Sequence, residues 1–285
     1  MSETSVTWWG HSTMWLSDTG TTLLTDPVLT DRLAHLRRMA GPRPELPGPP
    51  DAVLLSHLHA DHLHLASLRL IPGEPLLIVP RGSAAFITRG LGRGASGRCV
   101  ELASGEQTEV GAVRVRAVKA AHPGGRGPWS KLQAPALGFV VEGAARSWYA
   151  GDTGLFDEMS DLGPLDLALI PVGGWGPTLH AHEHLDPAQA SEALRRVRAA
   201  WAVPVHYGTF WPFGLGRLRQ HMFSGPGEEF AKQAASAAPD ARVRVLGQGE
   251  TLTIPAAAPD GPGFTAPSAP SVGPGAGSGT AGDDA

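Results

Sequence analysis

The chain has 285 residues with a formal net charge of −4, and 42% of them are hydrophobic, which is enough for a sizeable folded core. The acidic balance argues against a nucleic-acid-binding protein, because such surfaces usually carry a basic stripe. No run approaches the roughly 18 apolar residues of a transmembrane helix, and the polar start lacks the apolar segment of a signal peptide. Cys99 is the only cysteine, so no internal disulfide requires an oxidising compartment. We therefore expect a cytoplasmic protein with no transmembrane segment and no nucleic-acid partner.

The spacing of apolar residues predicts mixed α and β structure. Strands are predicted at 6–9, 14–17, 22–25, 52–55, 76–79, 100–102, 113–120, 137–141, 146–150, 167–170, 201–205 and 242–246. Helices are predicted at 65–70, 83–90, 156–162, 186–200 and 228–237. The clearest strand signal is the period-two alternation over 113–120. The clearest helix start is Asp186, because Pro187 suits the first turn and Gln189 stands at the reciprocal capping position.

Two segments fall outside this pattern. Residues 30–50 form a long loop rich in Arg and Pro, which we interpret either as a wall of a substrate site or as a plain surface excursion. Residues 256–285 consist mainly of Pro, Gly, Ala and Ser and cannot bury enough apolar surface to offset the entropy of ordering. The domain prediction is therefore one folded domain over 1–255 and a disordered tail over 256–285.

The most informative stretch is the run His57-Leu-His59-Ala-Asp61-His62-Leu-His64, directly after the predicted strand at 52–55. A loop packed with imidazoles has little to contribute to a core, whereas imidazole and carboxylate groups are good ligands for divalent metals. The run therefore predicts a metal site.

Three isolated residues have the surroundings expected of further ligands. His122 follows the strand at 113–120, Asp152 follows the strand at 146–150, and His206 follows the strand at 201–205. Each stands where an apolar strand gives way to a turn, and such strand ends build the active sites of open α/β proteins. Each residue alone is weak evidence, but with the histidine run they predict one shared site.

The ordered set resembles the metallo-β-lactamase-fold superfamily, whose pattern is His-x-His-x-Asp-His followed by a distant His, a distant Asp and a final His. The resemblance covers residues 5 to about 255, and it implies an α/β fold in the form of a four-layer αββα sandwich. The seven matching residues are His57, His59, Asp61, His62, His122, Asp152 and His206.

The resemblance also implies how the ligands divide between two divalent metal ions, with zinc expected first and manganese or iron as alternatives. The first metal would be held by His57, His59 and His122. The second would be held by Asp61, His62 and His206, with Asp152 bridging both. In such a binuclear hydrolase a metal-bridging hydroxide attacks the substrate, so Asp61 and Asp152 are also expected to serve catalysis.

Shorter segments resemble one branch of the superfamily. The openings Trp-Gly-His-Ser-Thr at 9–13 and Thr-Asp-Pro-Val-Leu at 25–29 are similar to those of ascorbate-6-phosphate lactonases and bacterial relatives of the N-acyl-phosphatidylethanolamine phospholipase D. The segment His-Leu-Asp-Pro at 184–187 is similar to the phospholipase itself. This branch favours a phosphodiesterase acting on a small-molecule or lipid-like substrate.

Three further residues are candidate helpers. His184 precedes a helix start within the phospholipase-like segment and is predicted to donate a proton or hydrogen bond to substrate. His11 is predicted to orient a metal ligand, and Arg126 to contact a phosphate group. For each, a solvent-facing loop residue is the plain alternative.

Other functions remain open on this sequence. A lactonase or other carbonyl-ester hydrolase could use the same site, and an iron-dependent redox enzyme could use the same ligands. The non-enzymatic alternative is a metal-stabilised binding or scaffold protein. A complete ligand set favours an enzyme, because a scaffold would be expected to have lost one or more ligands.

Overall fold

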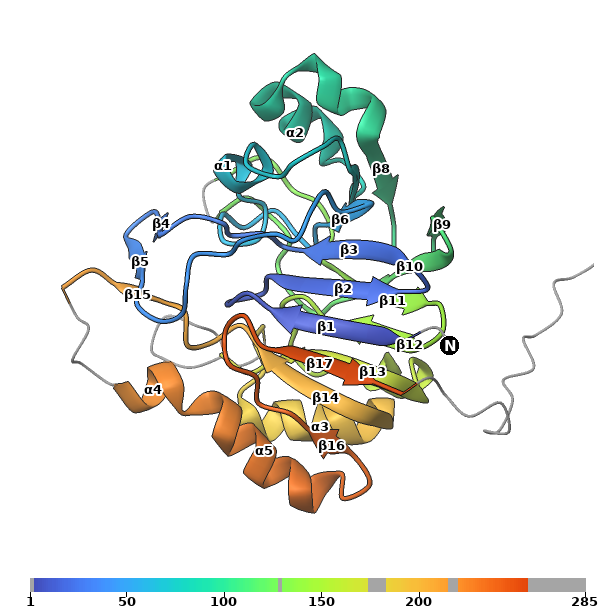
Figure 1. The fold of residues 1–285 in the computed structure, drawn as a ribbon, viewed down its shortest axis with the longest axis vertical. Coiled ribbons are helices and arrows are strands. Elements are labelled where there is room, and N and C mark those ends of the chain that lie inside the picture. Colours follow the sequence, from blue (N-terminus) through green and yellow to red (C-terminus); the bar gives the residue numbers. More distant parts are fainter. Residues whose placement is uncertain (1–2, 128–129, 174–182, 215–219, 256–285) are drawn as a thin grey trace, which may run out of the picture.

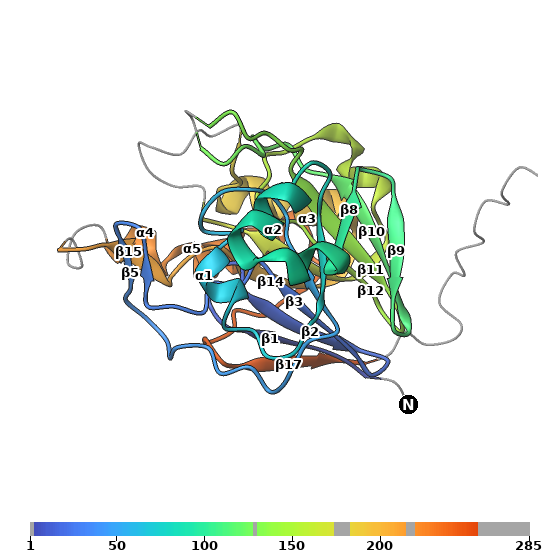
Figure 2. The ribbon, with the colours of Figure 1, turned by 90° about the horizontal axis from the view of Figure 1, so that it is seen from above.

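Two seven-stranded sheets face each other, with helices on their outer sides, in the computed structural model of the chain (Figure 1). The structure describes residues 3–127, 130–173, 183–214 and 220–255, so the predicted tail lies outside the described residues. The first sheet has the order β17-β1-β2-β3-β6-β7-β8, and the second has the order β16-β14-β13-β12-β11-β10-β9. Figure 2 shows the helices on the outer sides from above. The predicted αββα sandwich is confirmed.

The strands of the first sheet are β1 (Thr4–Trp8), β2 (Met14–Asp18), β3 (Thr21–Thr25), β6 (Ala52–Leu54), β7 (Leu76–Pro80), β8 (Cys99–Leu102) and β17 (Thr251–Ile254). Those of the second are β9 (Gln107–Val110), β10 (Val113–Lys119), β11 (Leu137–Glu142), β12 (Arg146–Tyr149), β13 (Leu165–Pro171), β14 (Ala199–Val205) and β16 (Arg242–Val243). In each sheet an antiparallel meander continues into parallel strands: β3, β6, β7 and β8 in the first, and β12, β13, β14 and β16 in the second. The carboxyl ends of the parallel strands therefore gather at one edge of each sheet.

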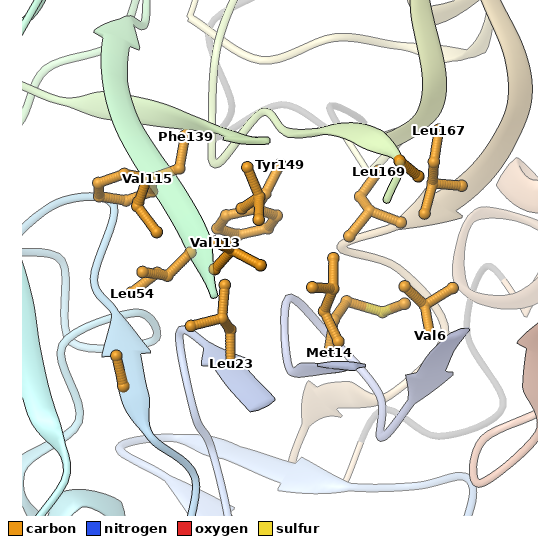
Figure 3. Close-up of a cluster of buried hydrophobic side chains, with 14 of the residues drawn as sticks. Val6, Met14, Leu23, Leu54, Val113, Val115, Phe139, Tyr149, Leu167 and Leu169 are labelled. Atoms are coloured by element: carbon orange, nitrogen blue, oxygen red, sulfur yellow. The ribbon is translucent and has the colours of Figure 1, made fainter. Parts of the chain in front are cut away.

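The main core lies between the two sheets. Val6, Met14 and Leu23 of the first sheet face Phe139 and Tyr149 of the second across this layer (Figure 3). The alternation over 113–120 is confirmed, because β10 buries every second residue from position 113 to 117. Phe139 is fully buried, and truncating such a side chain to alanine costs about 3–5 kcal/mol.

Helices cover the outer faces. Residues of α1 (Leu65–Leu68) and α2 (Ala84–Leu91) join the apolar cluster on the outside of the first sheet, and residues of α3 (Pro187–Val197) and α5 (Pro226–Ala237) join that of the second. A short α4 (Gln220–Ser224) precedes α5. No helix within the described residues combines the length and apolar character needed to cross a bilayer.

Several elements differ from the sequence prediction. The segment 156–162 forms only a short 3-10 helix, Asp157–Asp161. The helix from Asp186 ends at Val197 rather than near 200, because Arg198 adopts a left-handed conformation (φ 47°) and β14 begins at Ala199. The last predicted strand, 242–246, is reduced to two residues.

The long loop at 30–50 contains two strands that the sequence did not predict. β4 (Arg32–Leu33) and β5 (Leu36–Arg38) pair as a hairpin, and β15 (Phe210–Pro212) adds to β5. This three-stranded sheet, which we call the small sheet, projects from the side of the sandwich (Figures 1 and 2).

The predicted start of α3 gives a stability test. The Asp186 carboxylate accepts a hydrogen bond from the backbone N–H of Gln189 at 2.8 Å, and the Gln189 side chain accepts one from the backbone N–H of Asp186 at 3.2 Å. Asp186→Ala removes half of this capping box, so the free energy of unfolding should fall by about 1 kcal/mol in a denaturant titration. The exposed control Asp240→Ala should change it by less than about 0.5 kcal/mol. Equal effects would contradict the capping interpretation.

Candidate metal centre

The predicted ligands come from four separate strand ends that the two sheets bring together. The histidine run follows β6, His122 follows β10, Asp152 follows β12 and His206 follows β14. His206 adopts a left-handed backbone conformation with φ 62°. Its backbone N–H donates to the carbonyl oxygen of His11 at 2.9 Å. Both of these observations fix where its ring lies.

Three histidines form the first group of donor atoms. Nδ1 of His59 lies 3.0 Å from Nε2 of His57 and 3.1 Å from Nε2 of His122. Nitrogens bound to one tetrahedral zinc lie roughly 3.3 Å apart, since Zn–N bonds are about 2.0–2.1 Å long. Nδ1 of His122 donates to the carbonyl oxygen of Glu183 at 2.8 Å, which leaves its Nε2 lone pair facing the other two rings. This group suits one divalent cation.

The second group lies around two carboxylates. Oδ2 of Asp152 is 3.2 Å from Nε2 of His62 and 3.1 Å from Nε2 of His206. Oδ2 of Asp61 is 3.7 Å and 3.8 Å from the same two nitrogens. Nε2 of both histidines and Oδ1 of Asp152 are buried and have no hydrogen-bond partner within the part of the chain that the structure describes. Buried polar atoms normally have partners, so this donor set fits the binding of a cation.

Asp152 connects the two groups. Besides its contacts with His62 and His206, its carboxylate lies within one candidate ligand cluster with His122 and His184. Asp26 also clusters with His57 and His62, but Asp152 contacts the Nε2 atoms of His62 and His206 and lies beside His122 as well. Its position is the one expected of a bridging ligand.

Asp26 is a buried part of this site that the sequence reading did not pick out as functional. Its Oδ2 accepts hydrogen bonds from Nδ1 of His62 at 2.6 Å and from the Tyr149 hydroxyl at 2.5 Å. Its carboxylate also accepts from the backbone N–H of Ser56 at 2.8 Å and, through a short bond, from the Ser56 hydroxyl. Burial, followed by the charge of Asp26, raises the pKa of Tyr149 well above its usual value, so the phenol stays a donor. Asp26 thus fixes the His62 ring with Nε2 toward the second group.

The predicted helpers His11 and His184 both lie beside the candidate ligands. Nε2 of His11 is 3.2 Å from Oδ2 of Asp61, and its ring packs against that of His206 with centroids 4.3 Å apart. Nε2 of His184 is 3.5 Å from Oδ2 of Asp152, and its Nδ1 is buried with no hydrogen-bond partner in the described ranges. His184 stands where it could act on a bound substrate.

The phosphate-binding interpretation of Arg126 has no support in the geometry. Nη1 of Arg126 donates to the carbonyl oxygens of Leu58 at 2.8 Å and Leu63 at 2.7 Å, and its guanidinium lies over the Phe86 ring. The side chain is therefore engaged in holding the two ends of the histidine loop. His64 is the N-cap residue of α1, where its Nδ1 contacts the Ser67 hydroxyl at 2.7 Å.

The electrostatics differ between the two groups. Burial lowers the pKa of His57 well below its usual value and that of His122 to about 4, so both rings are neutral at pH 7, as metal ligands must be. Burial by itself would lower the pKa of His62 and His206. The nearby Asp152 carboxylate outweighs this effect and raises the pKa of His206 to about 9 and that of His62 well above its usual value. Without a metal, these two histidines carry the protons that balance the carboxylates.

Metal binding should therefore release protons. At pH 7, a cation entering the second group must displace the protons of His62 and His206, so about two protons should leave per chain. Protons compete with the cation for these two histidines more strongly as pH falls, so the apparent affinity for the metal should decrease from pH 9 toward pH 6. The measurement is calorimetric titration of metal-free protein with zinc at pH 7 in two buffers of different ionisation enthalpy. Binding heats that do not depend on the buffer would contradict this account.

Comparisons with known proteins identify the family of the chain. The family model described as the beta-lactamase superfamily domain matches residues 21–207. A UPF0173 metal-dependent hydrolase of Nitratidesulfovibrio vulgaris is 31% identical over 257 residues, which cover 88% of this chain and 96% of the relative. An N-acyl-phosphatidylethanolamine-hydrolyzing phospholipase D of Caenorhabditis elegans is 33% identical over 232 residues, covering 73% of this chain and 64% of that protein. Among solved structures, the metallo hydrolase Igni18 of Ignicoccus hospitalis superimposes with a TM-score of 0.67 at 24% identity, covering 89% of this chain and 99% of that one.

Proposed function

The chain belongs to the beta-lactamase superfamily of metal-dependent hydrolases, and from this premise we propose that it hydrolyses a small or lipid-like phosphodiester. The observation that carries the proposal is the pair of donor groups joined through Asp152. Two linked groups suit a pair of divalent cations, and paired cations suit displacement at phosphorus, where the attacking and leaving oxygens both carry charge. The similarity to the phospholipase D of Caenorhabditis elegans supports a phosphodiester.

We assign the first cation to the three-histidine group of His57, His59 and His122. The second belongs to Asp61, His62 and His206, with Asp152 shared. Bound divalent ions supply an acidified water and charge stabilisation at the phosphoryl oxygens. Zinc fits the nitrogen-rich first group. In the carboxylate-containing second group, manganese or iron fits as well as zinc does.

The protein's own residues then orient the metal ligands and deliver a proton to the substrate. Asp26 holds His62 in one tautomer through Nδ1, and His11 holds the Asp61 carboxylate from the other side. The Nδ1 atom of His184 has no hydrogen-bond partner among the described residues, so this atom or Nε2 is available to a substrate oxygen. We assign His184 to deliver a proton or hydrogen bond to that oxygen.

Hydrolysis of bis(p-nitrophenyl) phosphate tests the reaction type. Metal-free protein should be inactive, and reloading with zinc or manganese should restore turnover. A five- or six-membered lactone serves as the parallel substrate. Lactone hydrolysis without phosphodiester hydrolysis would sink the phosphodiesterase proposal in favour of a carbonyl hydrolase. Activity on neither substrate by protein loaded with metal would favour the scaffold interpretation.

The assignment of His184 has its own test. His184→Gln should lower kcat by on the order of a hundredfold while bound metal stays unchanged, because proton delivery contributes about that much to many hydrolases. The exposed His35→Gln is the matched control and should leave kcat unchanged. Loss of metal in His184→Gln would instead identify His184 as a ligand.

A further inference from the structure

The small sheet carries an unusual combination of exposed apolar and basic side chains. Large hydrophobic residues that are well exposed number three among the described residues, and two of them flank this sheet: Met39 at 48% and Phe213 at 72%. The third, Leu70, lies just after α1. The strands themselves project from the sandwich, as both views show (Figures 1 and 2). Phe213 stands opposite His35 at the hairpin-turn end of the small sheet, whereas Met39 stands opposite Thr209 at its other end, so Phe213 is the exposed apolar group at the hairpin turn.

Two basic side chains of the small sheet face each other across a strand pair. Arg32 and Arg37 stand directly opposite in the β4–β5 ladder, and like charges in that arrangement destabilise a strand pair. Within the described part of the chain, no ion pair joins either guanidinium to a carboxylate; Asp31 contacts Arg38 instead, at 3.8 Å. Both Arg32 and Arg37 are exposed, as is Arg43. The pair therefore lacks the negative charge that would balance it.

The two kinds of side chain meet in one hollow. Arg32, Arg37, His35, Leu36 and Phe213 line a shallow cleft of about 240 Å³ at the hairpin turn. The backbone N–H of Phe213 donates to the carbonyl oxygen of His35 at 3.2 Å, so the main chain at Phe213 is held against the hairpin. The cleft thus offers guanidinium groups and apolar contact side by side.

The small sheet is also rigidly coupled to the rim of the metal centre. Phe210 of β15 packs edge-on against His11 with centroids 5.9 Å apart, and Arg38 of β5 lies over the same Phe210 ring. Nη2 of Arg38 donates to the carbonyl oxygen of Val28 at 2.9 Å. Whatever binds the small sheet is therefore held next to the candidate site.

We propose that the small sheet docks the protein on the surface of an anionic phospholipid bilayer, with Phe213 entering the interface and Arg32 and Arg37 on the headgroup phosphates. A bilayer surface offers negative charge and apolar depth together, as the cleft requires. A projecting tip can reach a flat surface that the body of a protein with net charge −4 would be repelled by. The inference does not depend on the reaction catalysed.

Co-sedimentation with vesicles tests this proposal. The wild-type chain should bind vesicles containing about one third phosphatidylglycerol and not pure phosphatidylcholine vesicles, and about 1 M salt should release it. Arg32→Ala with Arg37→Ala should weaken binding by roughly 30-fold, since each basic residue near an anionic surface contributes about fivefold. Phe213→Ser should weaken binding without changing its salt dependence.

The matched controls remove arginines and an apolar side chain that are exposed outside the small sheet. Arg89→Ala with Arg93→Ala removes two exposed arginines at and after the end of α2, and Leu70→Ser removes the remaining exposed apolar side chain. Equal losses in the controls, or no wild-type binding to anionic vesicles, would overturn the proposal. A concentration-dependent dimer that Phe213→Ser abolishes would overturn it in favour of a second copy of the chain. Because sedimentation requires no turnover, none of these results bears on the proposed hydrolysis.

Discussion

Asp152→Ala should lower hydrolysis and bound metal together. Its carboxylate lies 3.1 Å from His206 and 3.2 Å from His62, and it belongs to the cluster that contains His122. Without it, two cations would repel each other with no shared negative charge between them. We expect the metal content to fall below two ions per chain and turnover to fall by roughly a thousandfold or more, because paired cations supply several kcal/mol of transition-state stabilisation.

The control for this variant is Asp157→Ala, whose carboxylate is fully exposed and contacts only Arg196 among the described ion pairs. Metal analysis, turnover of bis(p-nitrophenyl) phosphate and circular dichroism are measured on both proteins. A folded Asp152→Ala protein that keeps both metals and its activity would rule out the bridging assignment.

Asp26→Asn should weaken metal binding although Asp26 is in neither of the two donor groups that we assign to metals. The carboxylate receives hydrogen bonds from His62, Tyr149 and both donors of Ser56. An asparagine has one acceptor oxygen, and its amide would face donors. We expect a 10–100-fold loss of metal affinity and a decrease in unfolding free energy on the order of 3 kcal/mol, measured by competition with a chelating dye and by denaturant titration.

Asp18→Asn is the matched control, because Asp18 is another fully buried carboxylate. It ends β2 and accepts hydrogen bonds from Thr4 Oγ1 at 2.9 Å and from the backbone N–H of Ala144 at 2.8 Å, on the far end of β2 from His11. This variant should lose stability but keep its metal affinity. If both variants lost metal affinity equally, Asp26 would be a general stabilising residue rather than a ligand-orienting one.

Local patterns predicted the elements that carry strong signals. Strand β10 follows from alternation alone, and the start of α3 follows from the Asp186 capping box. The elements that were missed depend on distant pairing. Strand β17 exists because Ile254 pairs with Thr4 at the other end of the chain, and the hairpin strands of the small sheet are too short to show a period.

The same distinction applies to the candidate site. The histidine run predicts a metal site because it contains many ligand-type residues in a short stretch. The structure places the three remote residues beside it. Asp26 gave no comparable signal, since its partners His62 and Tyr149 lie 36 and 123 residues away. The contacts of Arg126 could not be predicted for the same reason: its carbonyl partners come together only when the histidine loop is folded back on itself.

The most direct test of the central claim is a stepwise zinc titration of metal-free protein while hydrolysis of bis(p-nitrophenyl) phosphate is followed. Two donor groups joined by Asp152 predict that activity rises until two equivalents of zinc are bound and then stays constant. Activity that saturates at one equivalent, or that does not depend on zinc or any other added divalent metal, would contradict a binuclear metal centre in this protein.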